Sequence, residues 1–118
     1  MGAWTSYRLR LQRKRRQVRA FRKRRELTEV VNRTRAIRPE DILVFSTLRN
    51  ERIRLPFFLK YYRDLGVSHF FIVDNGSDDG GREYLAEQED VSLWRTNASY
   101  KRSHFGVDWL NWLQRKYA

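Results

Sequence analysis

The chain has 118 residues, of which 41% are hydrophobic, so it can bury one modest core and form at most one domain. It has no cysteine, which excludes a disulfide framework, a thiolate zinc site and a cysteine nucleophile, and which is typical of a reducing compartment. The formal charge of +11 comes from residues 1–38, which carry 14 Lys and Arg against 2 acidic residues, because residues 39–118 carry 11 against 12.

Residues 7–27 are predicted to form a strongly basic helix. Leu11, Val18, Phe21 and Leu27 recur at near-helical intervals, and Lys or Arg occupies most of the positions between them. Such a cationic helix on a neutral body indicates an anionic partner, which could be a lipid surface, RNA or another protein. No apolar run here is long enough for a signal peptide or a membrane span, so we expect a cytoplasmic protein whose arm can rest on the inner face of the membrane.

Residues 28–39 are interpreted as a connector that ends at Pro39. The predicted division is therefore a basic helical arm and linker at 1–38, followed by the folded domain at 39–118. We expect the first 38 residues to lie outside the hydrophobic core, because they are dense in charge.

Three short apolar runs in the domain are predicted to be strands. The runs at 42–45 and 69–73 have the length and the residue types of strands that are buried on both faces, and a third run lies at 91–95. Each is followed by a helix pattern, which gives the order βαβαβα. This order predicts an α/β fold with a partial Rossmann-like parallel sheet, in which all strand-to-helix loops lie at one edge.

The helices of the domain have recognisable ends in the sequence. Asn50 is expected to cap the first helix, and Gly66 is expected to end it. A short helix is predicted near 82–88, and an amphipathic helix is predicted over 105–117. On that last helix, Trp109 and Trp112 are expected to pack in the core and not to form a platform on which a sugar stacks.

Two polar loops, at residues 46–51 and 74–80, follow the first two predicted strands. Both should lie at the carboxyl edge of the sheet, where such folds bind their ligands. Asp74 ends a strand, and a carboxylate there can accept hydrogen bonds from a base or a ribose. The run Asn-Gly-Ser-Asp-Asp-Gly also fits a simple tight turn that caps the next helix, so the loop residues alone leave both interpretations open.

The chain contains Leu-Arg-Asn-Glu at 48–51, Leu-Pro-Phe-Phe-Leu-Lys-Tyr-Tyr-Arg-Asp-Leu-Gly-Val at 55–67, and Phe-Ile-Val-Asp-Asn-Gly-Ser-Asp-Asp-Gly at 71–80. Together these stretches resemble the start of family-2-like glycosyltransferases with the GT-A fold. The resemblance covers about residues 41–117. It is more specific than the acidic loop alone, because an aromatic-rich helix and a strand precede the loop in the same order.

The resemblance implies the N-terminal half of a domain that binds a nucleoside-diphosphate sugar for glycosyl transfer, in the synthesis of cell-surface polysaccharide or glycolipid. Asp74 and the first loop would contact the nucleoside, and Asp78 or Asp79 would help to hold the second loop. The expected substrate-binding residues are Ser46, Thr47, Asn50, Glu51, Asp74, Asn75, Ser77, Asp79 and Arg102.

The basic stretch at 100–104 resembles the family segment that precedes the metal motif. There Arg102 or Lys101 would contact the diphosphate through charge-assisted hydrogen bonds. His104 shares this loop and is a weaker candidate for a ligand contact. A solvated basic loop that caps the last helix explains the stretch equally well.

The sequence departs from the family in its catalytic part. The resemblance implies a divalent cation, Mg or Mn, held by an Asp-x-Asp motif on a later strand, and a carboxylate that deprotonates the acceptor. Neither motif is present, and Asp108 stands alone in a predicted helix. We therefore expect a fragment, a truncated chain or a remnant that binds without turnover, and no catalytic residue or metal ligand is nominated. His69 is expected to be structural.

The alternative function is a non-catalytic binding module whose arm binds nucleic acid or an anionic membrane. The arm has many Arg but few interleaved aromatic residues, and it has no recognisable nucleic-acid-binding motif. Nucleic acid is therefore the less favoured partner.

Overall fold

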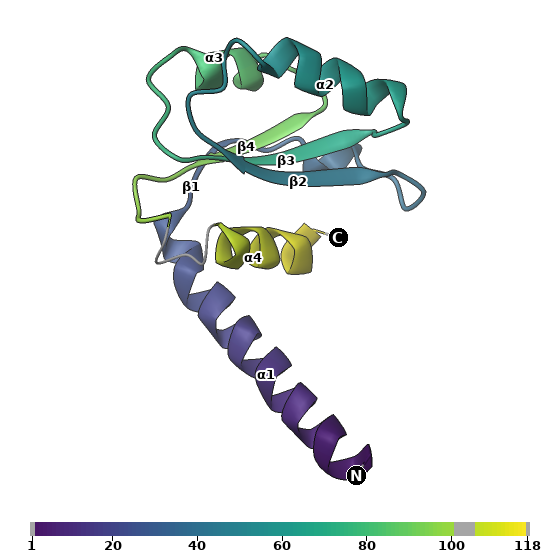
Figure 1. Ribbon diagram of the computed structural model, residues 1–118. Helices are drawn as coiled ribbons and strands as arrows, with labels where there is room; N and C mark the ends of the chain where they lie inside the picture. The colour runs from purple at the N-terminus through teal and green to yellow at the C-terminus, as the bar shows by residue number, and fades with distance from the viewer. Residues whose placement is uncertain (1, 101–105, 118) are drawn as a thin grey trace.

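The computed structural model describes residues 2–100 and 106–117, with the backbone alone for 2–8. Figure 1 shows a four-stranded sheet between two helical layers, from which a long N-terminal helix projects. The helices are α1 (Gly2–Lys23), α2 (Leu55–Asp64), α3 (Gly81–Ala86) and α4 (Val107–Tyr117), with short 3-10 turns at Arg24–Glu26 and Thr34–Ala36. The strands are β1 (Thr28–Val31), β2 (Leu43–Leu48), β3 (His69–Asp74) and β4 (Val91–Arg95).

The strand order in the sheet is β1-β4-β3-β2. The neighbours β2 and β3 are parallel, and so are β3 and β4, whereas β1 runs antiparallel to β4. The predicted α/β class and the parallel pairing of the three predicted strands are confirmed. The sheet is nevertheless mixed, because a fourth strand is added at the edge of β4.

This fourth strand, β1, lies where the sequence predicted a connector. Thr28 pairs with Arg95 and Val31 pairs with Leu93, so the prediction is wrong for these residues. Three of the four β1 residues are exposed, so the strand has no run of buried residues to reveal it. Its formation depends on the free edge of β4, which supplies hydrogen-bond partners more than sixty residues away in the chain.

The C-terminal half of α1 is docked on α4. Ala20 of α1 is fully buried, and the Arg19 Nε donates to the Oδ1 of Asp108 over 2.8 Å. Asp108 is itself fully buried, so its charge requires such a partner. The indole Nε1 of Trp109 also donates to Glu26, over 2.9 Å. The expectation that the first 38 residues lie outside the core is therefore wrong for Ala20 of α1 and for Val31 of β1, which packs against the core layer of α2 and α3.

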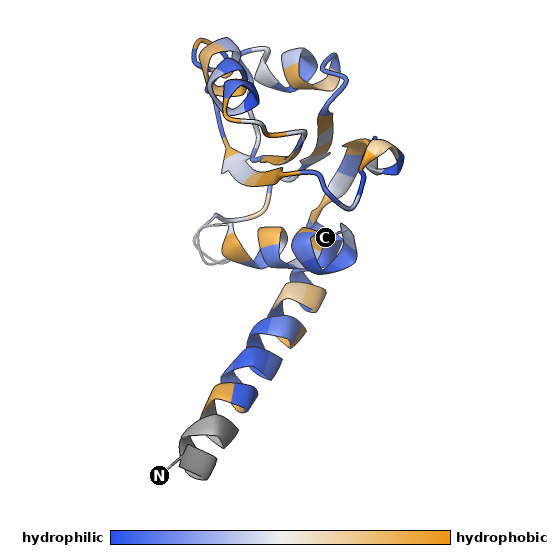
Figure 2. Cartoon of the chain, turned by 90° about the vertical axis from the view of Figure 1, so that its right-hand side faces the viewer, coloured by the Kyte–Doolittle hydropathy of each residue, from blue (hydrophilic) through white to orange (hydrophobic). Residues whose placement is uncertain are grey.

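The central strand β3 is buried along its whole length, and its side chains alternate between two core layers. Phe70 and Ile72 pack against the layer of α2 and α3, whereas Phe71 and Val73 pack against α4. Figure 2 shows the contrast between this largely hydrophobic sheet and the mostly hydrophilic α1. Fully buried partners are Leu55, Leu59 and Leu85 on one side and Trp109 and Leu113 on the other, which confirms Trp109 as a core residue.

Helix α2 begins later than predicted and ends as predicted. Asn50 does not cap it, because the backbone of Asn50 is left-handed (φ 53°) and the helix begins at Leu55, with Pro56 in its first turn. Gly66 ends the helix at φ 101°, and the N–H of Val67 donates to the carbonyl of Tyr62 over 3.0 Å. This six-residue closure is a Schellman motif, which requires a residue that tolerates positive φ.

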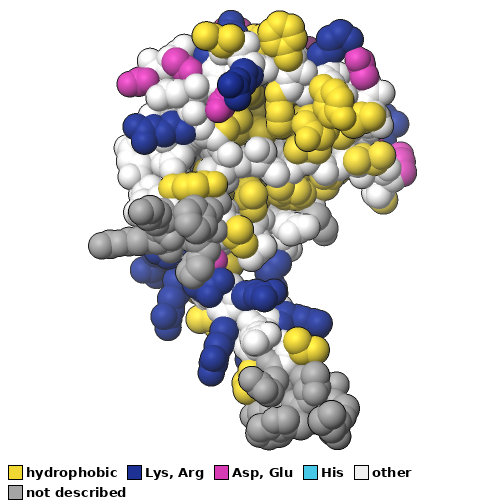
Figure 3. Space-filling view, in the orientation of Figure 1, with side chains coloured by type: hydrophobic (Ala, Val, Ile, Leu, Met, Phe, Trp, Pro, Cys, Tyr) yellow, Lys and Arg dark blue, Asp and Glu magenta, His cyan; other side chains and the backbone are white. Residues whose placement is uncertain are grey.

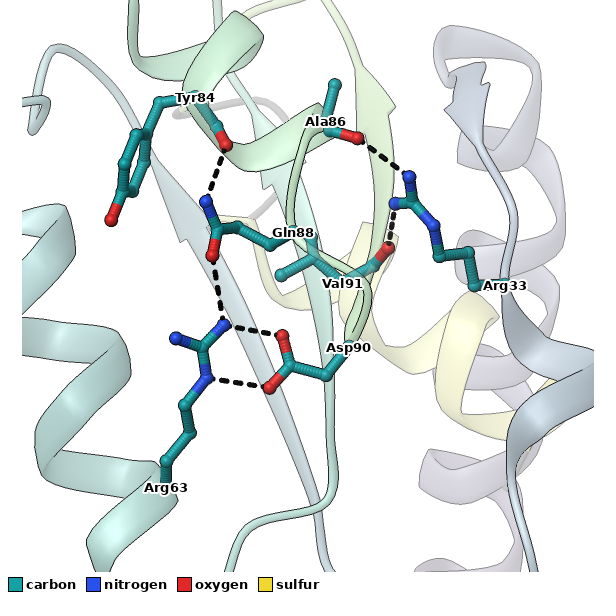
Figure 4. A network of polar contacts seen from close by, with 7 residues as sticks. All are labelled: Arg33, Arg63, Tyr84, Ala86, Gln88, Asp90 and Val91. Atoms are coloured by element: carbon teal, nitrogen blue, oxygen red, sulfur yellow. Dashed lines mark hydrogen bonds and ion pairs between the residues drawn. The ribbon is translucent and has the colours of Figure 1, made fainter.

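A polar network ties the helices to the amino edge of the sheet (Figure 4). The Arg63 guanidinium of α2 donates two hydrogen bonds to Asp90, of 2.7 and 2.6 Å, and one to the Oε1 of Gln88. From the other side, Arg33 donates to the carbonyls of Ala86 and Val91. The network thus joins α2, the turn before β4 and the segment after β1.

Candidate functional site

The carboxyl ends of β2 and β3 lie side by side. In the parallel register Leu48 is opposite Asp74, and the N–H of Asn75 donates to the carbonyl of Leu48 over 2.9 Å. The two polar loops therefore leave the sheet at the same edge, as predicted. Parallel pairing with helical crossovers makes this placement unavoidable.

Hydrogen bonds between backbone and side chains hold the two loops together. The N–H of Asn50 donates to the Ser77 Oγ over 2.9 Å, and the Oδ1 of Asn50 accepts from the N–H of Asp78 over 2.9 Å. The Asp79 carboxylate accepts from the N–H of Arg52 over 3.0 Å. Hydrogen bonds of Asn50, Ser77 and Asp79 thus hold the two loops against each other.

Asp79 also hydrogen-bonds to the first residue of the helix that follows. Its Oδ1 accepts from the N–H of Gly81 at the start of α3 over 2.9 Å. The hydrogen bond from the backbone N–H of Arg52 is the largest cause that lowers the pKa of the Asp79 carboxyl, and the bond from Gly81 adds to it. Asp79 therefore stays ionised at neutral pH.

Asp74 is fully buried beneath the second loop. Its Oδ2 accepts from the N–H of Ser77 over 3.1 Å and from the Nε of Arg82 over 3.2 Å, and Arg82 also donates to the carbonyl of Ser77. Asp74 shares the strand face of Ile72, which points toward α2 and α3. In this structure its carboxylate organises the loop and does not line the pocket described next.

A pocket of about 550 Å³ opens at this edge between β2 and α2. Leu48, Leu55 and Phe58 are its apolar lining residues, and Arg49 and Arg54 are its two basic ones. The remaining lining residues are Ser46, Thr47, Glu51, Asn75 and Tyr100. An apolar wall with a few convergent polar groups is typical of a small-molecule site.

Thr47 is one of the lining residues, but its side chain lies on the face of β2 that Leu43 and Phe45 share, which packs toward α4, and its hydroxyl is buried. Among the described residues, Thr47 Oγ1 and Asp74 Oδ1 are the buried side-chain oxygens without a hydrogen-bond partner. A buried hydroxyl left unpaired costs about 1–3 kcal/mol, and this hydroxyl faces the Gly106 side of β2 and not the space between β2 and α2. Below Thr47 the backbone of Gly106 approaches closely, since a Cβ there would lie 2.6 Å from the Thr47 Oγ1.

The cationic groups of the pocket were not nominated from the sequence. Arg54 has a side chain that is 82% exposed and an ion pair with Glu51 at 3.7 Å, and Arg49 is exposed. The available signal was the presence of several arginines just after a strand, in a loop expected to face an anionic ligand. Arg52, the third arginine in this segment, instead places its guanidinium 4.1 Å from the centre of the Tyr84 ring.

The predicted site residues thus divide into two groups. Ser46, Thr47, Glu51 and Asn75 line the pocket. The others within the described part of the chain build and hold the loops, and these are Asn50, Asp74, Ser77 and Asp79. Arg102 and His104, and the rest of the segment 101–105, lie outside the described residues.

The described residues do not fit the divalent cation that the resemblance implies. Within residues 2–100 and 106–117, no three His, Cys, Asp or Glu side chains are grouped so that they could hold a metal ion. His69 is structural, as expected, because its buried Nε2 lies 2.8 Å from the Ser92 Oγ and burial lowers its pKa.

The helices of the described part include none that is both long and apolar enough to cross a membrane. Comparison with known proteins adds no relative: no family model, no curated protein and no solved structure matches the chain.

Proposed function

We propose that the carboxyl edge of this sheet binds a nucleoside-diphosphate sugar for glycosyl transfer, in the synthesis of cell-surface polysaccharide or glycolipid. The observation that carries the proposal is the parallel register of Leu48 and Asp74, which joins two polar loops beside a pocket of about 550 Å³. This volume lies within the range of about 300–1,000 Å³ that small-molecule sites occupy. The resemblance of residues 41–117 to family-2-like glycosyltransferases supports the same assignment.

The lining matches the chemistry of such a ligand in three parts. The guanidinium groups of Arg49 and Arg54 suit a diphosphate, because they make charge-assisted hydrogen bonds to anionic oxygens. The Asn75 side chain can pair with donors and acceptors of a base or a ribose. Phe58 offers an apolar surface against which a ring can pack.

The contribution of this chain to glycosyl transfer would be binding and orientation. Negative charge develops on the diphosphate as the sugar leaves, and fixed positive groups stabilise that charge. We propose Arg49 and Arg54, the two basic residues of the lining, for this role. A divalent cation would supply further neutralisation in the family that the chain resembles, but no step is derived through it because the described residues do not form its site.

Isothermal titration of the full chain with uridine diphosphate and with adenosine diphosphate tests the proposal. Wild-type protein should bind at least one of them more tightly than it binds the matching nucleoside, because the phosphates meet the two guanidinium groups. Arg49→Gln should weaken diphosphate binding about tenfold, which corresponds to about 1.4 kcal/mol.

Arg95→Gln is the matched control, because Arg95 is an exposed arginine at the end of β4 that does not line the pocket. This variant should bind like the wild type. Equal losses in the two variants would show that general charge attraction holds the diphosphate, and the pocket assignment would then be rejected.

A further inference from the structure

The N-terminal helix α1 presents a dense positive surface outside the proposed nucleotide site. It contains nine Lys and Arg and no acidic residue. Among the described residues, ion pairs engage only Arg19 and Lys23 of this helix. Figure 3 shows basic side chains gathered along the projecting helix, with hydrophobic side chains between them.

The two sides of α1 differ in what they face. Ala20 is buried against α4, and Leu11 lies nine residues before it, which is about two and a half helical turns and therefore the opposite side. Val18 lies on that opposite side too, two turns after Leu11. Leu11 is 38% exposed and Val18 is 46% exposed. An apolar pair thus lies on the outward side.

Cations flank this apolar pair. Lys14, Arg15 and Arg22 fall on the outward side by the same helical spacing, and all three are exposed. We name the set Leu11, Lys14, Arg15, Val18 and Arg22 the outward face of α1. Its composition, aliphatic in the middle and basic at the sides, is that of a helix that lies in a membrane interface.

We infer that the outward face of α1 binds an anionic lipid surface, with Leu11 and Val18 inserted among the acyl chains and the cations at the headgroups. This inference is independent of the proposed function, because none of these residues lines the nucleotide pocket. Anionic headgroups attract each nearby Lys or Arg, and the inserted side chains add apolar burial.

The outward face suits lipid better than nucleic acid. Exposed aliphatic side chains make no favourable contacts with a phosphate backbone. Single-stranded nucleic acid is bound through aromatic side chains on which the bases stack. The described aromatic residue of α1 is Phe21, and its ring is already engaged: it packs edge-on to Trp112, with ring centres 5.9 Å apart, and carries the Arg24 guanidinium 3.5 Å from its centre.

The docking of α1 on α4 makes this surface a fixed part of the molecule. The Arg19–Asp108 ion pair and the buried Ala20 hold the base of the helix, so a membrane that binds the outward face also sets the orientation of the body. A freely jointed tail would bind without such an effect.

Sedimentation of the full chain with phosphatidylcholine vesicles that contain about one third phosphatidylserine tests the inference. Lys14→Gln with Arg15→Gln should lower the vesicle partition coefficient about 25-fold, since each cation contributes about fivefold. The matched control is Arg13→Gln with Arg16→Gln, which removes the same charge from the side that lines a groove against α4. The control should lose less than about fivefold.

A second pair of substitutions tests the apolar part. Leu11→Gln with Val18→Gln leaves the charge unchanged and should lower vesicle binding about tenfold, with helix content by circular dichroism unchanged because both residues are exposed. Unchanged vesicle binding in this variant would overturn the inference. Equal losses in the two charge pairs, or tighter binding to a random oligonucleotide than to the vesicles at the same salt, would also overturn it.

Discussion

The amino edge and the carboxyl edge of the sheet, where the parallel strands begin and end, are held by different kinds of contact. At the amino edge, Arg63 and Asp90 form a bidentate ion pair that Gln88 extends, and the side chains satisfy one another. At the carboxyl edge, Asn50 and Asp79 hold the loops through backbone N–H groups, and a pocket stays open beside them. The same sheet thus closes its amino edge with paired charges, whereas exposed basic residues line a pocket at its carboxyl edge.

The pKa shifts follow the same division. At Asp90, burial raises the pKa of the carboxyl, but the hydrogen bond and the charge of Arg63 outweigh burial and lower it overall. Arg63 in turn has a raised pKa, first because of its hydrogen bond to Asp90. Paired groups of this kind stabilise the fold, whereas Arg49 and Arg54 at the pocket are exposed, with Arg54 3.7 Å from the Glu51 carboxylate.

The largest expected effect concerns the packing beneath the carboxyl edge. Gly106→Ala should lower the free energy of unfolding by about 2–4 kcal/mol, because the new Cβ would meet the Thr47 side chain at 2.6 Å and the backbone there has φ 83°. Denaturant unfolding measures the change. Gly66→Ala is the control, because φ is 101° there but no atom lies within 4 Å of the Cβ position. Equal losses in both variants would show that the contact with Thr47 is not tight.

A substitution at the amino edge should lower the stability of the fold and leave nucleotide affinity unchanged. Asp90→Ala should lower the free energy of unfolding by about 1–2 kcal/mol, because it leaves the partly buried Arg63 without its acceptor and because the pair is partly solvent-screened. Thermal unfolding and nucleotide titration on the same variant provide the two measurements. A large loss of nucleotide affinity would contradict the separation of the two edges.

His69 should make the amino edge sensitive to mild acid. Its pKa is lowered by burial, which outweighs the opposing charges of Asp90 and Asp41, so the unfolded chain binds its proton more readily than the folded chain does. Stability should therefore fall as the pH drops below the ordinary histidine value of about 6.5, by at most about 1.4 kcal/mol per pH unit. A plot of the free energy of unfolding against pH should be flatter in His69→Gln across this range. An identical pH dependence in that variant would refute the assignment.

The smallest stability effect is expected at Asp79, although its effect on binding should be clear. Asp79→Ala removes the acceptor for the N–H groups of Arg52 and Gly81, so the first loop should loosen and nucleotide affinity should fall severalfold. The unfolding midpoint should change little because the carboxylate is exposed. Asp78→Ala is the control, since only the backbone of Asp78 takes part in the described loop contacts. The same loss of nucleotide affinity in both variants would argue against a role for the Asp79 hydrogen bonds to Arg52 and Gly81.

The acid response of Asp79 has the opposite origin to that of His69. Because the folded state lowers the pKa of this carboxyl, its contribution is complete above its ordinary value and is lost as the pH falls through the lower folded value. Loosening of the loops by this route therefore belongs to strongly acid solutions, well below the range in which His69 acts.

Local patterns in the sequence predict the parallel βαβαβα part of the fold. Buried strands such as β3 are continuous apolar runs, and Gly66 and the stretch at 91–95 carry local signals that the structure confirms. Ser46, Thr47, Glu51 and Asn75 line the pocket and belong to the two polar stretches that were expected at the carboxyl edge, although Ser46 and Thr47 lie within β2 itself.

Only the tertiary structure decided what depends on partners far along the chain. The pairing of β1 with β4 and the docking of Arg19 on Asp108 join segments separated by more than sixty residues, and no local pattern encodes them. The same holds for Asp74, whose position at a strand end suggested an exposed carboxylate, whereas the loop that folds over it and Arg82 bury it. Periodicity specifies which residues form an element, but the burial of a polar side chain is set by the segments that pack around it.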